Sequence, residues 1–189
     1  MKKNTLITVL LLISTLVQSQ FKYDTTARVN PLDTLQFDQI IAYTVNYDAE
    51  KKMRTRDQME SGIVEYRFDE PYASAKTILS KKQSSRLIAL LSDTATYGQT
   101  RADCFEPRMA LQFLKNGKDV FRILICEDCN YLESTVPLPA AERKYYEISY
   151  EDEGEVKVFR RYQRGFSDQG KLAISELCKE LKLAYCRKY

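Results

Sequence analysis

The feature that most constrains this fold is a pair of apolar runs separated by an Asn-Gly dipeptide. The runs at 109–114 and 120–125 flank Asn116 and Gly117. Asn-Gly between apolar runs favours a two-residue type I′ turn, because both central residues must take positive φ values. The pattern therefore predicts an antiparallel β-hairpin in the middle of the chain.

The turn also predicts a register for this hairpin. Counting outward from a two-residue loop places Phe113 opposite Val120 and Met109 opposite Leu124. Hydrogen-bonded and non-hydrogen-bonded pairs alternate along such a ladder. The count therefore predicts the partner of each residue and the type of each pair.

Three of the five cysteines bracket the hairpin. The same count puts Cys104 opposite Cys129 at a non-hydrogen-bonded pair, where Cα atoms lie about 4.5 Å apart and a disulfide can form. Pro107 cannot donate to the ladder, and a bulge there would make Cys126 the partner of Cys104 instead. We expect a Cys104–Cys129 disulfide first and a Cys104–Cys126 disulfide second.

This stretch resembles a group of exported bacterial proteins that share a Cys-Phe-x-Pro … Cys-x-x-Cys-Asn core. The core lies here at 104–107 and 126–130, and the resemblance extends to the helices beginning near 79 and 166. The group has no assigned function. The resemblance implies an α+β domain and carries no statement about activity.

The N-terminus has the pattern of a secretory signal peptide. Two lysines precede an apolar run at 6–17, and Ser19 supplies the small residue before cleavage. The run is too short for a transmembrane helix. We expect a signal peptide at 1–19 and a single domain at 20–189, exported to the periplasm or secreted, with no transmembrane segment after cleavage.

Composition excludes several classes of function. The chain has no histidine, which removes Ser-His-Asp and Cys-His catalysis and histidine metal sites. Glycine-rich phosphate loops and Gly-x-Ser-x-Gly motifs are also absent. Loss of the two leader lysines lowers the formal charge from +3 to +1, which gives no reason to expect nucleic acid. We expect no catalytic residues, cofactor or metal, and a protein or envelope ligand of unknown identity as partner.

The N-terminal half contains two further strand patterns. Alternating apolar residues at 35–47 predict a strand with one buried face, and the run at 63–68 predicts a second strand. The polar start at 20–33 is expected to be extended or mobile. The charged segment at 49–60 is interpreted as a solvated loop, with a docking site for an acidic partner as the alternative.

Two capped helices are predicted. Ser80 and Gln83 have the capping-box spacing, and an apolar stripe that includes Leu90 and Leu91 follows. This helix is expected to end near Thr96. Ser167 is expected to cap a last helix, whose inward face is predicted to consist of four residues: Leu172, Ala173, Leu177 and Leu181.

A second hairpin is predicted around Asp152-Glu153-Gly154, between alternating apolar residues at 146–150 and 156–158. Together these elements predict an α+β fold, with an antiparallel sheet of about five or six strands and two packed helices.

The cysteines leave two chemical alternatives open. Cys126-x-x-Cys129 could act as a thiol–disulfide centre, but such centres lie at helix N-termini, and 130–137 is a poor helix former. Zinc is the other alternative, with Cys104, Cys126 and Cys129 as ligands. Its proposed fourth ligand comes from a set of three: Glu127, Asp128 or Cys178. The favoured interpretation is a non-enzymatic binding or structural domain stapled by a disulfide at the central hairpin.

Two remaining features concern the C-terminal third. Cys178 and Cys186 can pair only if the chain turns back after Lys182. The arginines at 160, 161 and 164 could bind an anion, although such residues more often line an exposed strand edge. The acidic run at 151–155 lacks calcium-loop spacing and is interpreted as a solvated turn.

Overall fold

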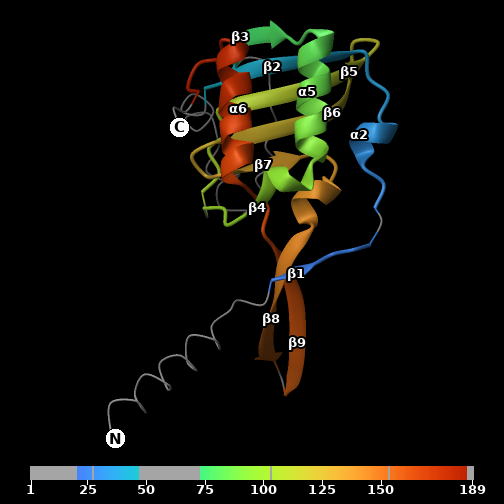
Figure 1. The fold of residues 1–189 in the computed structure, drawn as a ribbon, viewed down its shortest axis with the longest axis vertical. Helices are drawn as coiled ribbons and strands as arrows, with labels where there is room; N and C mark the ends of the chain where they lie inside the picture. Colours follow the sequence, from blue (N-terminus) through green and yellow to red (C-terminus); the bar gives the residue numbers. More distant parts are fainter. Residues whose placement is uncertain (1–20, 27, 47–72, 103, 153, 187–189) are drawn as a thin grey trace, which may run out of the picture.

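The computed structural model describes residues 21–26, 28–46, 73–102, 104–152 and 154–186. Within these ranges the chain forms three antiparallel sheets and three α-helices (Figure 1). The predicted α+β class is confirmed, but the ten strands of the described ranges exceed the five or six expected. The predicted signal peptide at 1–19, charged segment at 49–60 and strand at 63–68 lie outside the described residues.

The largest sheet has five strands in the order β3-β2-β5-β6-β7. Its strands are β2 (Gln39–Val45), β3 (Ala73–Ile78), β5 (Met109–Lys115), β6 (Lys118–Cys126) and β7 (Tyr131–Ser134). The sequence pattern did not indicate β3, whose apolar residues are few. The sheet therefore combines the predicted central hairpin with one edge strand that lacks a strand-like sequence.

The central hairpin has the predicted turn. Asn116 and Gly117 take φ values of 50° and 72°, as a type I′ turn requires. The predicted register holds only next to the turn, because Val120 forms a one-residue bulge. Phe113 lies opposite Phe121 and Met109 opposite Ile125, so the predicted partners of both residues were wrong.

The apolar pattern of β6 explains the bulge. The predicted register would have placed Arg122 opposite Leu111, on the face that the helices cover. The observed register pairs Leu111 with Ile123 and moves Arg122 opposite Gln112 on the other face. A one-residue shift moves every side chain of a strand to the opposite face of the sheet. The free energy gained by burying the apolar side chains of β6 therefore outweighs the hydrogen bonding lost at the bulge.

β2 is buried on both faces, which corrects the prediction of one buried face. Ile40 and Ala42 belong to the core shared with the helices, whereas Ile41, Tyr43 and Val45 belong to a second apolar cluster. Phe105 and Tyr131 belong to this second cluster, so both faces of β2 are covered by apolar side chains.

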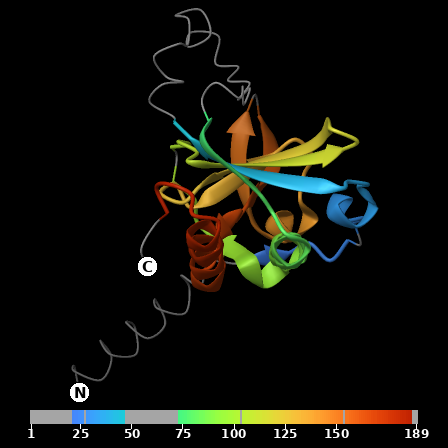
Figure 2. The same ribbon diagram turned by 90° about the horizontal axis from the view of Figure 1, so that it is seen from above.

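Helices α5 (Lys81–Ser92) and α6 (Asp168–Glu180) lie on the same side of this sheet (Figure 2). The capping box of Ser80 and Gln83 is confirmed. The helix ends at Ser92 rather than near Thr96, because the Asp93 side chain caps a separate 3₁₀ turn, η2 (Thr94–Thr96). Leu91 is fully buried in the core, whereas Leu90 is only partly buried.

α6 begins after Ser167, whose hydroxyl accepts the Gly170 N–H at 3.0 Å, as predicted. Its predicted inward face needs one correction. Leu172 is 48% exposed, and Ile174 is buried instead. The buried positions at 174, 177, 178 and 181 follow helical spacing, whereas residue 172 lies about 140° around the axis from 177.

The last helix is tied to the chain end by a disulfide between Cys178 and Cys186. Their Cα atoms are 5.6 Å apart. Lys182 and Tyr185 take positive φ values, which turn the chain back toward the helix. The condition stated for this pairing is therefore met.

The N-terminal segment was predicted to be extended or mobile, but the structure shows a short helix and a short strand there. Asn30 caps a short helix, α2 (Pro31–Thr34), and β1 (Lys22–Tyr23) pairs with β8 (Lys144–Asp152). β1 is an edge strand of a three-stranded sheet with the order β1-β8-β9. The N-terminal segment thus connects the β8–β9 hairpin with the helices.

The second predicted hairpin is confirmed as β8 and β9 (Glu155–Tyr162). It projects away from the five-stranded sheet and its helices (Figure 1), and we call it the arm. We call the end of the arm where Tyr145 pairs with Tyr162 its base. A two-stranded sheet of β10 (Gly165–Phe166) and β4 (Tyr97–Gln99) lies close to this base, as does the 3₁₀ turn η3 (Pro139–Glu142). No helix within the described ranges is both long and apolar enough to cross a membrane.

Candidate functional site

The structure brings the three predicted cysteines together beside the central hairpin. Cys104 Sγ lies 2.7 Å from Cys129 Sγ, with both present as free thiols. The Cys129 N–H donates to Cys126 Sγ at 3.1 Å. The expected Cys104–Cys129 bond therefore has its sulfur atoms adjacent, and it stays a prediction.

Loop contacts, rather than the ladder, create this proximity. β5 begins only at Met109, so Cys104 lies outside any strand. The preceding loop is tied to Cys129 by two hydrogen bonds, from Ala102 N–H to its carbonyl at 2.9 Å and from Glu106 N–H to its sulfur at 3.4 Å. The predicted hairpin register therefore does not explain the contact, although it named two residues that meet.

The environment of Cys129 is that of a protonated thiol. The residue is 1% exposed. Burial raises its pKa well above the ordinary value, and its hydrogen bonds with Cys104 and Cys126 raise it further. The turn after Cys126 leads into β7 rather than a helix, so no helix N-terminus stabilises a thiolate. This geometry does not favour nucleophilic thiol chemistry at Cys129.

The zinc alternative loses one of its proposed ligands. Cys178 is bonded to Cys186 on the helical layer and has no thiolate to offer. Among the described residues, no cluster of three or more Cys, Asp or Glu side chains has an arrangement that could hold a metal ion.

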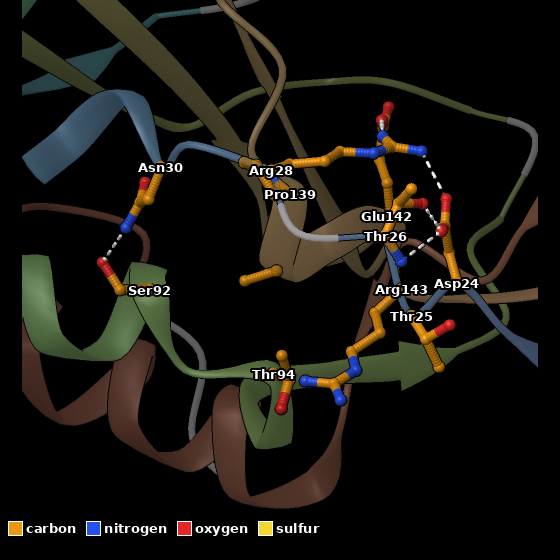
Figure 3. Close-up of a pocket in the computed structure, with 11 residues that line it drawn as sticks. Asp24, Thr25, Thr26, Arg28, Asn30, Ser92, Thr94, Pro139, Glu142 and Arg143 are labelled. Carbon is orange, nitrogen blue, oxygen red and sulfur yellow. Dashed lines mark hydrogen bonds and ion pairs between the residues drawn. The ribbon is translucent and has the colours of Figure 1, made fainter. Parts of the chain in front are cut away.

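Polar pockets surround the base of the arm, and Figure 3 shows one of them. It has a volume of about 300 Å³ and lies between the N-terminal segment, the end of α5 and η3. The Asn30 amide donates to Ser92 Oγ at 2.7 Å, which joins the N-terminal segment to α5. Arg143 reaches into the pocket beside Thr94, as Figure 3 shows, and its guanidinium has no ion pair or hydrogen bond within the described part of the chain.

One wall of this pocket is an ionic network. Arg28 bonds to Asp24 and, at 2.9 Å, to Glu142. The Thr26 hydroxyl and backbone N–H, together with Arg28, lower the pKa of Asp24 to about 2. The network fastens the N-terminal segment to η3. The sequence pattern did not indicate these residues, because they are far apart in the chain and belong to no motif.

A second pocket, of about 410 Å³, adjoins the first and shares Thr94, Ala140 and Arg143 with it. Tyr23 and Tyr97 also line it, together with Gln163. The Tyr97 hydroxyl donates to the Leu91 carbonyl at 3.1 Å, and burial raises its pKa. The two pockets therefore lie next to each other at the arm's base.

A third pocket, of about 380 Å³, shares Gln163 with the second. We call it the arginine pocket, and it is lined by Thr100, Arg101, Tyr146, Arg160, Arg161, Tyr162, Gln163 and Arg164. The sequence indicated three of its four arginines as an anion-binding cluster or a charged strand edge. It did not indicate Arg101, which lies about 60 residues earlier and reaches the site only through the β4–β10 pairing.

Comparisons with protein-family models, curated proteins and solved structures found no match for this chain. The resemblance to exported bacterial proteins therefore stays a prediction.

Proposed function

We propose that this chain is an exported, non-enzymatic binding protein whose ligand occupies the pockets around the base of the arm. The observation that carries this proposal is the arrangement of three adjoining polar pockets at that base. Their volumes lie within the range of small-molecule sites, and their walls supply charged and neutral hydrogen-bonding groups. The buried Cys129, in contrast, offers no activated nucleophile, because burial raises the pKa of its thiol.

The proposal assigns the cysteines beside the central hairpin a structural role. A Cys104–Cys129 disulfide would close a loop with a sequence separation of 25. Such a closure stabilises the folded state by about 3.5 kcal/mol, by restricting the unfolded chain. It would fasten the loop that leads from the arginine pocket to β5, and so support one wall of the site.

Peptide mapping without reduction tests this role against the thiol-active and zinc alternatives. We expect one fragment that joins the Cys104 and Cys129 peptides, and a buried Cys126 that reacts slowly with thiol reagents in the native protein. A Cys126–Cys129 bond with a reactive thiol of low pKa would contradict the proposal in favour of the thiol-active protein. Three free thiols that take up zinc would contradict it in favour of a zinc site.

The binding role is tested with Arg143→Ala in the full chain. The immobilised protein is exposed to envelope extract, and the retained material is compared between variants. We expect Arg143→Ala to reduce retention of the specific ligand. The Arg143 guanidinium lines the first two pockets and has no ion pair or hydrogen bond within the described residues, so its donors can bind a ligand. Lys118→Ala, an exposed cation at the turn of the central hairpin, should retain the wild-type amount. Equal retention by all three proteins would exclude the first two pockets, which Arg143 lines, as the site.

A further inference from the structure

The arginine pocket has an unusual lining. Four of its eight lining residues are arginines, and the other four are neutral residues with hydroxyl or amide groups: Thr100, Tyr146, Tyr162 and Gln163. No carboxylate is among the described residues that line it. A hollow lined by cationic and hydrogen-bonding groups alone is complementary to an anion.

The pocket's two walls are joined to each other. One wall is the segment after β4, with Thr100 and Arg101, and the other is the end of β9 and the residues after it. The Thr100 hydroxyl donates to Gln163 Oε1 at 3.2 Å, and the Asn130 amide donates to the Thr100 carbonyl at 3.0 Å. The first contact links the two walls directly, and the second fastens Thr100 to the turn between β6 and β7.

Two of the four arginines are held by the flat faces of their guanidinium groups. Arg101 stacks on the Tyr131 ring at 4.6 Å, and Arg160 stacks on the Tyr145 ring at 4.7 Å. Stacking uses the face of a guanidinium and leaves its in-plane N–H groups available. Arg164 has a buried Nε without a hydrogen-bond partner in the described part of the chain.

Nearby carboxylates offset only part of this charge. Glu142 is bonded to Arg164, and Asp24 lies 3.9 Å from Arg160. Burial raises the pKa of Glu133, whereas its interactions with Arg101 and Arg164 have the smaller effect and lower it. Asp24 and Glu142 are shared with Arg28 in the neighbouring network. Among the described residues, these three carboxylates are fewer than the four arginines of the lining.

We propose that the arginine pocket binds a small molecule that carries a phosphate or sulfate group. The inference rests on the proposed function and adds the chemical class of the ligand. A carboxylate has two oxygens and is satisfied by one guanidinium, whereas a tetrahedral oxyanion can accept from several arginines at once. The volume of about 380 Å³ leaves room for an attached group of sugar size beside Tyr146 and Tyr162.

Isothermal titration calorimetry on the full chain tests this proposal, at a constant ionic strength set with sodium chloride. The probes are inorganic phosphate, sulfate, glucose 6-phosphate, glucuronate and glucose. We expect the three tetrahedral oxyanions to bind, glucose 6-phosphate most tightly, and glucose not to bind. No binding of any oxyanion at 10 mM, or glucuronate binding as tightly as glucose 6-phosphate, would overturn the proposal.

Variants place the binding in the pocket. Arg161→Gln and Arg101→Gln should each weaken glucose 6-phosphate binding about tenfold, the effect of losing one charged hydrogen bond. Lys118→Gln removes the same charge from the remote turn and should leave the affinity unchanged. Equal affinity in all four proteins would overturn the proposal, because the ligand would then bind elsewhere. Both arginines are exposed, so the variants should keep the wild-type melting temperature.

Two further results complete the test. The first distinguishes a small phosphorylated ligand from a lipid headgroup, and the second separates failure of this inference from failure of the proposed function. Sedimentation with phosphatidylglycerol vesicles, without binding of glucose 6-phosphate, would overturn the small-molecule proposal in favour of a lipid headgroup. The wild-type protein could bind no phosphate compound and still retain a ligand from envelope extract in an Arg143-dependent way. That result would overturn this inference alone. The proposed function would then survive.

Discussion

The central hairpin and the arm are built from the same local pattern and have opposite surroundings. Each has two antiparallel strands, a two-residue loop and alternating apolar side chains. Phe113 and Phe121 in the central hairpin are 0% and 1% exposed. Val158 and Phe159 in the arm are 59% and 46% exposed. A hairpin pattern therefore predicts the strand pairing but not the layer that the hairpin joins.

The neighbours of each hairpin explain the difference. β5 and β6 lie between β2 and β7, with two helices over one face. Within the described ranges the arm has only β1 beside it, and this strand pairs with β8 at two positions near the base. Lys157, Arg160 and Arg161 occupy its free outer strand, and such charges discourage pairing with another sheet. The pockets lie at the base, where the exposed hairpin meets the packed body.

The largest expected effect compares one phenylalanine from each hairpin. Phe113→Ala should lower the free energy of unfolding by about 3–5 kcal/mol, because it removes a fully buried ring from the core. Phe159→Ala should lower it by less than about 1.5 kcal/mol, since it mainly loses an edge contact with Tyr150. Urea denaturation measures both. Similar losses would contradict the distinction between body and arm.

The next effect tests the packed face of the body's last helix. Leu177→Ala should cost about 2–5 kcal/mol, whereas Leu172→Ala on the outer face should cost under about 0.5 kcal/mol. The pair is matched in residue type and helix, so differences in helix propensity cancel. If Leu172→Ala were the more damaging change, the helix would have to face the sheet with its other side.

A smaller effect is expected from the disulfide that fastens the end of the body. Cys178 and Cys186 close a loop with a sequence separation of 8. Its closure should contribute about 2.5 kcal/mol to the unfolding free energy. The double variant Cys178→Ala/Cys186→Ala should lose this amount in oxidising buffer. Wild-type protein with this bond selectively reduced serves as the control. Unchanged stability would show that the bond does not form in solution.

The smallest effect concerns the contact between the N-terminal segment and the arm's base. Asp24 has a pKa of about 2 in the folded protein, below its ordinary value of 3.8. A depressed carboxyl pKa stabilises the fold above the unfolded value, and that contribution is lost as the pH falls from about 4 toward 2. Unfolding free energies measured across this window should fall less steeply in Asp24→Asn. Asp33→Asn, an exposed carboxyl on α2, should keep the wild-type slope.

Local sequence chemistry determined much of this protein. Asn116-Gly117 produced a type I′ turn because few other residue pairs accept two positive φ values. Ser80 and Ser167 began their helices because their hydroxyls accept N–H groups only a few residues away. The arm's hairpin was likewise readable from alternation and a glycine turn. These features depend on residues that are neighbours in the chain.

Only the tertiary structure decided the features that depend on which surfaces meet. The bulge at Val120 arose because the helices cover one face of the sheet, and that face excludes Arg122. Leu172 stayed exposed because α6 turned Ile174 inward. β2 became buried on both faces because the core shared with the helices covers one face and a second apolar cluster, which includes Phe105, covers the other. The pockets at the arm's base draw on side chains more than a hundred positions apart, such as Asp24 and Glu142. No local pattern encodes such a meeting, because it depends on how separately formed elements bury their apolar faces against one another.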